Sequence, residues 1–162
     1  RGFFMRSYDD ELFEEAGINT KWVQENHSKS LLKNTVRGMH FILSPHTDGK
    51  LIRCLKGKVW DVFVDLRKGS ETYGKWDSIE LTEDKPAYLY LPKGFAHGFC
   101  TLTDNSEILY KHDTHYQKDF DFGISWNDKD IGIKWPVDNP IISGKDSSLI
   151  SFKKFTKQYG GL

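Results

Sequence analysis

The chain of 162 residues is long enough to enclose one hydrophobic core, so a single domain over residues 1–162 is expected. Its 23 basic and 23 acidic residues leave no net charge, which excludes a global attraction to nucleic acid or to an anionic membrane surface. No apolar run approaches the ~20 residues of a membrane-spanning helix, and no signal-peptide pattern is visible, so the expected location is the cytoplasm. Cys54 and Cys100 are expected there as free thiols, with a single disulfide as the alternative.

One helix is expected near the start of the chain. The stretch "YDDELFEEAG", residues 8–17, offers Asp9 and Asp10 as capping residues and Gly17 as a stop. After residue 22 the pattern becomes strand-like. Residues 50–70 predict two strands around a turn at 56–58, and the second strand places Trp60, Val62, Val64 and Leu66 on one face.

Further short strands are expected in "GKWDSIELT", "AYLYLP", "FCTLTD" and "SEILYKH", which are separated by turn-forming residues. The tail from residue 126 is rich in turns, and "SSLISFKKF" suggests a short helix close to the end. Many short strands with little helix predict an all-β fold, an antiparallel sandwich or barrel with one or two short helices.

The stretch "LPKGFAHGF", residues 91–99, narrows the architecture. Pro92, Gly94 and His97 stand in a pattern that resembles the second motif of cupins, which are small jelly-roll barrels. There the Pro-Gly pair turns the chain so that the histidine can point into the mouth of the barrel. The alternative is a structural histidine in a turn beside two phenylalanines.

Many cupins bind a metal ion through an HxH pair, a carboxylate and the histidine of the second motif, but this chain lacks HxH. His40 and His46 are six residues apart, and His112 and His115 are three apart in an expected loop. We therefore expect no metal, with a non-haem iron site of two histidines and a carboxylate as the alternative. His46 is expected on a surface loop without a role, and the last two histidines stay ambiguous.

Cations are unusually frequent in "VRGMHFILSPHTDGKLIRC", residues 36–54. A histidine base, the Lys50 ammonium and the phenol of Tyr110 would together suit proton abstraction next to a carbonyl, because the enolate needs electrostatic support. Arg37 and Arg1 could hold phosphates, and Asp146 could orient a histidine. The alternative is that these side chains are structural or solvated, with Asp146 capping the last helix. These patterns alone indicate a cupin-like enzyme or binding protein.

The motifs "RGFF", "WVQENHSKS", "VRGMHF", "GKLIRCLKGKVWDVFVDLRKGSETYGKW", "LPKGFAHGF", "EILYK" and "WNDKDIGIKWP" follow one another in this order. Together they closely resemble the dTDP-4-dehydrorhamnose 3,5-epimerase family, from the first residue to about residue 146. The resemblance implies a cupin-type jelly roll, usually a homodimer, that uses neither metal nor organic cofactor. It also implies a nucleotide-linked 4-keto-6-deoxyhexose as substrate, on a route to L-rhamnose and cell-surface polysaccharide.

The resemblance also implies roles, carried over position by position. His40 matches the catalytic base, Asp146 its partner, Lys50 the donor to the C4 oxygen, and Tyr110 the acid on the opposite face. Tyr116 matches a ring that stacks on the nucleobase. The remaining positions that match substrate contacts, several of them at the diphosphate, are Arg1, Gln24, Asn26, Arg37, His97 and Lys145.

The chain departs from the family's usual pattern at two positions of substrate recognition, where Arg6 and Asp121 stand in place of glutamate. An arginine offers only donors, so a CDP-sugar stays open beside the expected dTDP-sugar. A single-centre 3- or 5-epimerase, a 3,4-ketoisomerase of related sugars and a non-catalytic sensor of sugar nucleotides are also compatible with these residues. Family members usually have ~20 residues before "RGFF", in strands that join the partner, and we expect such a segment upstream of Arg1.

Overall fold

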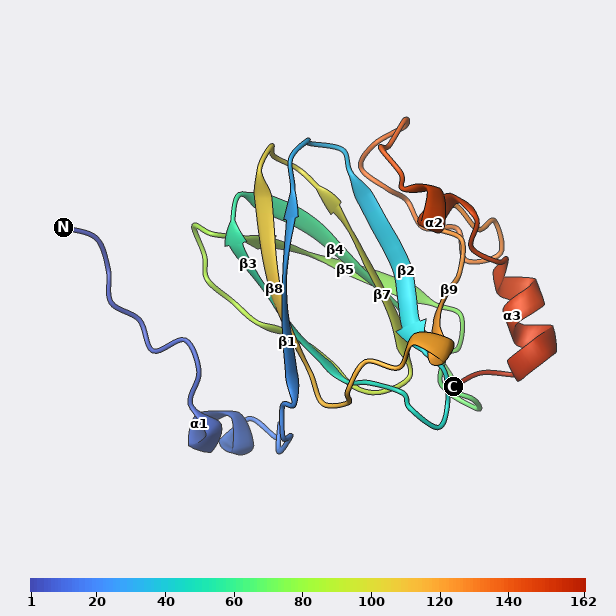
Figure 1. Cartoon of the computed structure of the whole chain (residues 1–162), viewed down its shortest axis with the longest axis horizontal. Helices are drawn as coiled ribbons and strands as arrows, with labels where there is room; N and C mark the ends of the chain where they lie inside the picture. The colour runs from blue at the N-terminus through green and yellow to red at the C-terminus, as the bar shows by residue number, and fades with distance from the viewer.

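The computed structural model describes residues 1–162 and folds them into two antiparallel β-sheets (Figure 1). Four strands in the order β1-β8-β3-β6 form one sheet, and five in the order β5-β4-β7-β2-β9 form the other. The strands are β1 (Gln24–Ser30), β2 (Val36–Ile42), β3 (Lys50–Lys56), β4 (Lys58–Asp65), β5 (Trp76–Thr82), β6 (Leu89–Leu91), β7 (Phe95–Thr101), β8 (Ser106–His112) and β9 (Asp121–Gly123). The helices are α1 (Asp10–Glu15), the 3-10 turn η1 (Lys118–Phe120), α2 (Gly144–Ser147) and α3 (Phe152–Tyr159).

The inner faces of the two sheets share one hydrophobic core. Ile52, Leu91 and Ile108 of the four-stranded sheet pack in one buried cluster with Val59 and Phe99 of the five-stranded sheet. This core fills only part of the space between the sheets, because polar side chains occupy the inward positions toward one end of β1 and β8. The all-β sandwich predicted from the sequence is therefore confirmed.

The five-stranded sheet is buried on its outer face as well. Val62 and Val64 of β4 pack there with Phe41 of β2, with Ile124 and with Phe155 of α3. In Figure 1 the C-terminal segment with α2 and α3 lies against the side of the sheet that carries β2 and β9. Helix α3 begins at the side chain of Ser151, which accepts a hydrogen bond from the backbone of Lys154, and the tail helix expected from the sequence is confirmed.

Helix α1 starts where the sequence predicts, because the Asp9 side chain accepts a hydrogen bond from the Leu12 backbone and Gly17 follows with a φ of 81°. The residues before this helix extend away from the sheets (Figure 1). Their apolar side chains are in solvent, with Phe3 81% and Phe4 99% exposed. This arm contributes little to the core of the single chain.

The structure corrects one sequence expectation and confirms another. His112 was expected in a loop, but it is the last residue of β8, hydrogen-bonded as part of the sheet between β1 and β3. Cys54 and Cys100 are buried free thiols, as expected, and burial raises the pKa of both to about 11. None of the helices is long and apolar enough to cross a membrane.

Candidate active site

A cavity of about 220 Å³ opens between the two sheets. One wall is formed by β1, β3 and β8, and the opposite wall by β2 and β7. Strict alternation explains the polar lining on the first wall: Gln24, Asn26 and Ser28 of β1 point inward and line the cavity, whereas Glu25 and His27 point outward and are exposed. The strand is polar on both faces, because its inward face meets a cavity instead of the core.

A β-bulge on β2 shapes the opposite wall. Arg37 and His40 are three residues apart, so in a regular strand their side chains would point to opposite faces. The pairing with β7 is irregular between them, and both line the cavity. Gly38 makes the bulge possible: its φ is 120°, and a Cβ at this position would lie 2.7 Å from the Cα of Gly98. The bulge that this glycine permits therefore places Arg37 and His40 in one cavity.

His40 forms a short hydrogen bond with Asp146, with 2.6 Å between Nε2 and Oδ1. Asp146 is almost fully buried in α2, its backbone N–H donates to the Ser143 hydroxyl, and its second carboxylate oxygen accepts a bond from the Gly38 backbone. Burial alone would raise the pKa of Asp146, but the hydrogen bond from His40 holds it below the usual range. Since Ser151 caps α3, Asp146 is not the cap of the last helix.

Lys50 projects into the cavity from the first residue of β3, and its Nζ lies 2.9 Å from Oδ1 of Asp48. The second oxygen of Asp48 lies 2.7 Å from Nδ1 of His112. All three side chains are largely shielded from solvent. Burial would raise the pKa of Asp48, but the neighbouring Lys50 and His112 bring it down to about 2.

Tyr110 of β8 stands on the wall opposite His40 and packs against the inner core. Burial raises the pKa of its phenol above the usual value, and Arg37 opposes this effect only in part. The hydroxyl therefore keeps its proton at neutral pH and can serve as a proton donor.

His97 and Asp61 form a buried pair deeper between the sheets, with 2.9 Å between Nε2 and Oδ2. Burial raises the pKa of Asp61, against the charge of His97. His97 is also the cross-strand neighbour of His40, and it lines the cavity as the cupin-like motif predicts.

Three residues form the rim of the cavity. The Tyr116 hydroxyl donates to Asp121 across 3.1 Å, and the Lys145 ammonium donates to the same carboxylate oxygen across 2.7 Å. The Tyr116 ring is about half exposed. The rim therefore offers an open aromatic face beside a cation.

The structure thus brings together most of the residues selected from the sequence. His40, Lys50 and Tyr110 line the cavity, Asp146 lies directly behind His40, and the further lining residues from that selection are Gln24, Asn26, Arg37, His97, Tyr116, Asp121 and Lys145. Arg1 and Arg6 do not line it. The Arg6 guanidinium instead binds Asp9 of its own segment at 2.7 Å, so substrate contacts from these two arginines stay a prediction.

Sequence reasoning missed Asp48 and His112. Each stands two residues from a selected residue, Asp48 before Lys50 and His112 after Tyr110, and both line the cavity. Strand alternation would have placed the His112 side chain on the cavity face with Tyr110, whereas Asp48 lies in the loop before β3, where alternation does not apply. The chain holds no group of three or more His, Cys, Asp or Glu side chains arranged to hold a metal ion.

Residues 1–154 match the model of the dTDP-4-dehydrorhamnose 3,5-epimerase family. The chain belongs to this family. An epimerase of this name from Shigella flexneri is 50% identical over 90% of this chain and 81% of its own length. The Bacillus anthracis enzyme, solved with TDP and pyrophosphate bound, superposes with a TM-score of 0.92 at 44% identity, over 93% of this chain and 86% of its own.

The Legionella pneumophila enzyme, solved with dTDP-4-keto-L-rhamnose, superposes with a TM-score of 0.91 at 36% identity, over 98% of this chain and 84% of its own. A dTDP-4-dehydrorhamnose 3-epimerase from Streptomyces niveus is also similar, at 35% identity over 93% of this chain and 72% of its own length. The cupin-type jelly roll and the sugar-nucleotide epimerase class expected from the sequence are confirmed.

Proposed function

We propose that the protein inverts both C3 and C5 of dTDP-4-keto-6-deoxyglucose, giving dTDP-4-keto-L-rhamnose, with His40 as the base and Tyr110 as the acid. The main observation in support is that these two side chains lie on opposite walls of one cavity, on β2 and β8. Inversion requires this arrangement, because the proton must leave from one face of the sugar carbon and return to the other.

The hydrogen bond to Asp146 determines which nitrogen of His40 acts. A neutral His40 that donates its Nε2–H to Asp146 carries its lone pair on Nδ1, which is then the basic atom. Nδ1 takes the proton from the carbon next to the ketone, and the electron pair of that C–H bond moves through the carbonyl to the C4 oxygen. Asp146 stabilises the imidazolium that forms.

Lys50 supports the enolate. Its ammonium stands among largely shielded side chains, where a hydrogen bond to an oxyanion is stronger than in water. Tyr110 then gives its hydroxyl proton to the opposite face of the carbon, the C4 carbonyl re-forms, and solvent restores the protonation states of Tyr110 and His40.

The rim suits the nucleotide. Arg37 and Lys145 line the cavity and offer cationic donors for a diphosphate, and the open face of Tyr116 offers a surface for the nucleobase. The dTDP-sugar bound to the Legionella enzyme supports dTDP over a CDP-linked substrate. We include a homodimer in the proposal, since the exposed phenylalanines of the N-terminal arm would be covered by a partner.

The test is solvent deuterium exchange. The protein is incubated in D₂O with dTDP-4-keto-6-deoxyglucose, and NMR follows the signals at C3 and C5. We expect loss of proton signal at both carbons together with the appearance of the inverted sugar. Exchange at one carbon alone identifies a single-centre epimerase, and a migrated ketone identifies a 3,4-ketoisomerase. If dTDP binds without exchange at either carbon, the protein is a sensor and the proposal fails.

A further inference from the structure

The neighbourhood of Lys50 contains two residues to which the mechanism above gives no role. We propose that Asp48 and His112 are positioning residues that hold the Lys50 ammonium at a fixed point of the cavity, through a hydrogen-bond chain whose direction is set by a backbone amide. The inference rests on the proposed function in one respect, namely that Lys50 serves the enolate oxygen.

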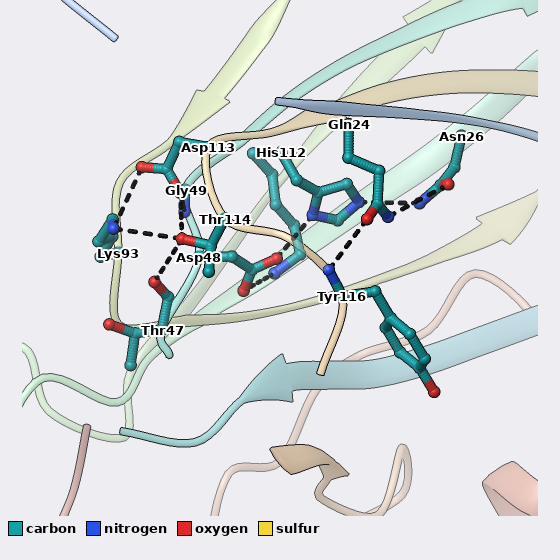
Figure 2. Close-up of polar contacts among 11 residues, drawn as sticks. Gln24, Asn26, Thr47, Asp48, Gly49, Lys93, His112, Asp113, Thr114 and Tyr116 are labelled. Carbon is teal, nitrogen blue, oxygen red and sulfur yellow. Dashed lines mark hydrogen bonds and ion pairs between the residues drawn. The ribbon is translucent and has the colours of Figure 1, made fainter. Parts of the chain in front are cut away.

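The strand register places the members of this chain side by side. Lys50 of β3 and Gln24 of β1 are both direct partners of His112 on β8, so the three residues form one row across three strands. Asn26 stands in the next inward row, beside Tyr110. Figure 2 shows Gln24, Asn26, His112 and Asp48 linked in succession along this wall.

The hydrogen-bond chain begins at a backbone N–H, which can only donate. The backbone N–H of Tyr116 donates to the Gln24 side-chain oxygen across 3.0 Å, which turns the amide nitrogen of Gln24 toward Asn26. That nitrogen donates to the Asn26 oxygen across 3.3 Å, and the Asn26 amide nitrogen then lies 3.2 Å from Nε2 of His112. Nε2 of His112 must therefore be an acceptor.

The same orientation determines the rest of the network. A His112 ring that accepts at Nε2 is neutral and carries its proton on Nδ1, from which it donates to Asp48 across 2.7 Å. Asp48 receives this bond on one oxygen and the Lys50 ammonium on the other, at 2.9 Å. A protonated His112 would direct an N–H at the Asn26 amide nitrogen. Two donors would then face each other, and the hydrogen-bond chain would be interrupted. Asp48 is thus kept as a carboxylate with its two oxygens committed in opposite directions.

The loop that carries Asp48 is held in place independently. The neighbouring Gly49 donates its backbone N–H to Asp113 across 2.8 Å, and the Thr114 hydroxyl donates to the Thr47 carbonyl across 3.2 Å. Figure 2 shows these contacts on the far side of Asp48 from His112. Because its backbone is fixed and its carboxylate is oriented by His112, Asp48 holds the Lys50 ammonium in one position. Such positioning matters because a displacement of about 1 Å can cost on the order of 10²-fold in rate.

The first experiment reads the proton positions without any activity. His112 is observed in ¹⁵N-histidine-labelled wild-type protein at neutral pH by long-range ¹H–¹⁵N NMR, and is assigned by the loss of its signals in His112→Phe. We expect a protonated Nδ1 and a bare Nε2. A ring with the proton on Nε2, or on both nitrogens, would overturn the proposed chain.

The second experiment measures the consequence for catalysis. In His112→Phe the ring volume stays but both nitrogens are lost, so we expect kcat for deuterium exchange to fall about 10- to 100-fold while dTDP affinity changes little. In His112→Asn an amide can again donate to Asp48, and most of the loss should be recovered. The matched control is His27→Phe, because His27 of β1 forms a similar pair with Glu107 of β8 at 3.0 Å, but on the exposed face of the same sheet.

A kcat of His112→Phe equal to that of wild type, or an equal loss in His27→Phe, would remove the positioning role. If the wild-type protein does not act on dTDP-4-keto-6-deoxyglucose at all, the proposed function fails separately. The ring tautomer then still tests the chain, and a crystal structure of His112→Phe tests the positioning. An unmoved Lys50 ammonium there would count against it.

Discussion

At the residue scale, the site depends on the pairing of His40 with Asp146, whose carboxylate is held in one orientation. Asp146 binds His40 with one oxygen and the Gly38 backbone N–H with the other, so its two acceptors are both committed. An asparagine at this position has one acceptor oxygen, which the Gly38 N–H would require. Its NH₂ group would then be directed at His40. The ring would have to place its proton on Nδ1, the atom that should act as the base.

We therefore expect His40→Ala to abolish deuterium exchange at both sugar carbons, and Asp146→Asn to reduce it on the order of 10²–10⁴-fold. Both variants should bind dTDP nearly as well as wild type, because the proposed diphosphate contacts, Arg37 and Lys145, are unchanged in both. Isothermal titration with dTDP and NMR exchange measure the two quantities on the same samples. Exchange at the wild-type rate in His40→Ala would exclude this residue as the base.

Tyr110→Phe separates proton return from proton removal. The base and the enolate donor stay in this variant, but the proton source on the opposite wall is lost. Deuterium should still enter the substrate from the side of His40, while inversion falls on the order of 10²–10⁴-fold. The ratio of exchanged to inverted sugar, read in one NMR series, measures the effect. A variant that inverts as fast as wild type would show that water or another side chain is the acid.

At the element scale, the bulge in β2 shows what the sequence can and cannot predict. The short strands of the sandwich follow from the pattern of residues and are present in the structure, but β1 is polar on both faces, so no apolar alternation shows which of its faces is inward. The joint placement of Arg37 and His40 does not follow, because a spacing of three predicts opposite faces. The residue types suggested Arg37 as a phosphate contact and a histidine as the base, and the resemblance to a family then selected His40 as that histidine. The positions of Arg1 and Arg6 depend on an arm with few contacts to its own domain, which no local pattern determines.

Gly38→Ala tests the bulge directly. The new methyl group would meet the Gly98 backbone at 2.7 Å, in a backbone conformation of φ 120° that is unfavourable for alanine. We expect the free energy of unfolding to fall by at least about 1–3 kcal/mol, together with a loss of exchange activity. Urea unfolding measures the first effect. Gly144→Ala is the matched control, because no atom lies within 4 Å of its added Cβ and it should unfold close to wild type.

At the scale of the whole molecule, the arm before α1 bears on assembly. Phe3 and Phe4 are among the most exposed apolar residues of the chain and lie beyond its core. Full burial of a phenylalanine stabilises by about 1.5–3 kcal/mol, so a dimer that covers both on each chain would gain several kcal/mol from them. We expect Phe3→Ser with Phe4→Ser to raise the dissociation constant roughly 100-fold or more. Sedimentation velocity over a dilution series measures it.

Ile79→Ser is the control for the arm, since Ile79 is an exposed apolar residue on β5 of the five-stranded sheet. A wild-type protein that sediments as a monomer at all concentrations would contradict the proposed homodimer. Unchanged association of the double variant would show that a different surface forms it.

Two buried carboxylates of the site, Asp48 and Asp146, also contribute to the response of the whole fold to acid. Interactions in the folded state hold the pKa of Asp48 at about 2, below its ordinary value of 3.8, and they lower the pKa of Asp146 as well. A lowered pKa stabilises the fold above the ordinary value, and this contribution is lost as the pH falls toward the folded value. For Asp48 the window runs from about pH 4 to about pH 2 and is worth roughly 2 kcal/mol.

Urea unfolding at pH 7 and pH 2.5 should therefore give a smaller difference in unfolding free energy for Asp48→Asn than for wild type, by about 1.5 kcal/mol. The variant should also be less stable at pH 7, because Lys50 would be buried without its carboxylate partner. Asp77→Asn on the exposed side of β5 controls for the change in net charge, since it removes a carboxylate without a buried partner. If Asp48→Asn and Asp77→Asn lose the same free energy between the two pH values, the Lys50–Asp48–His112 cluster does not couple folding to pH.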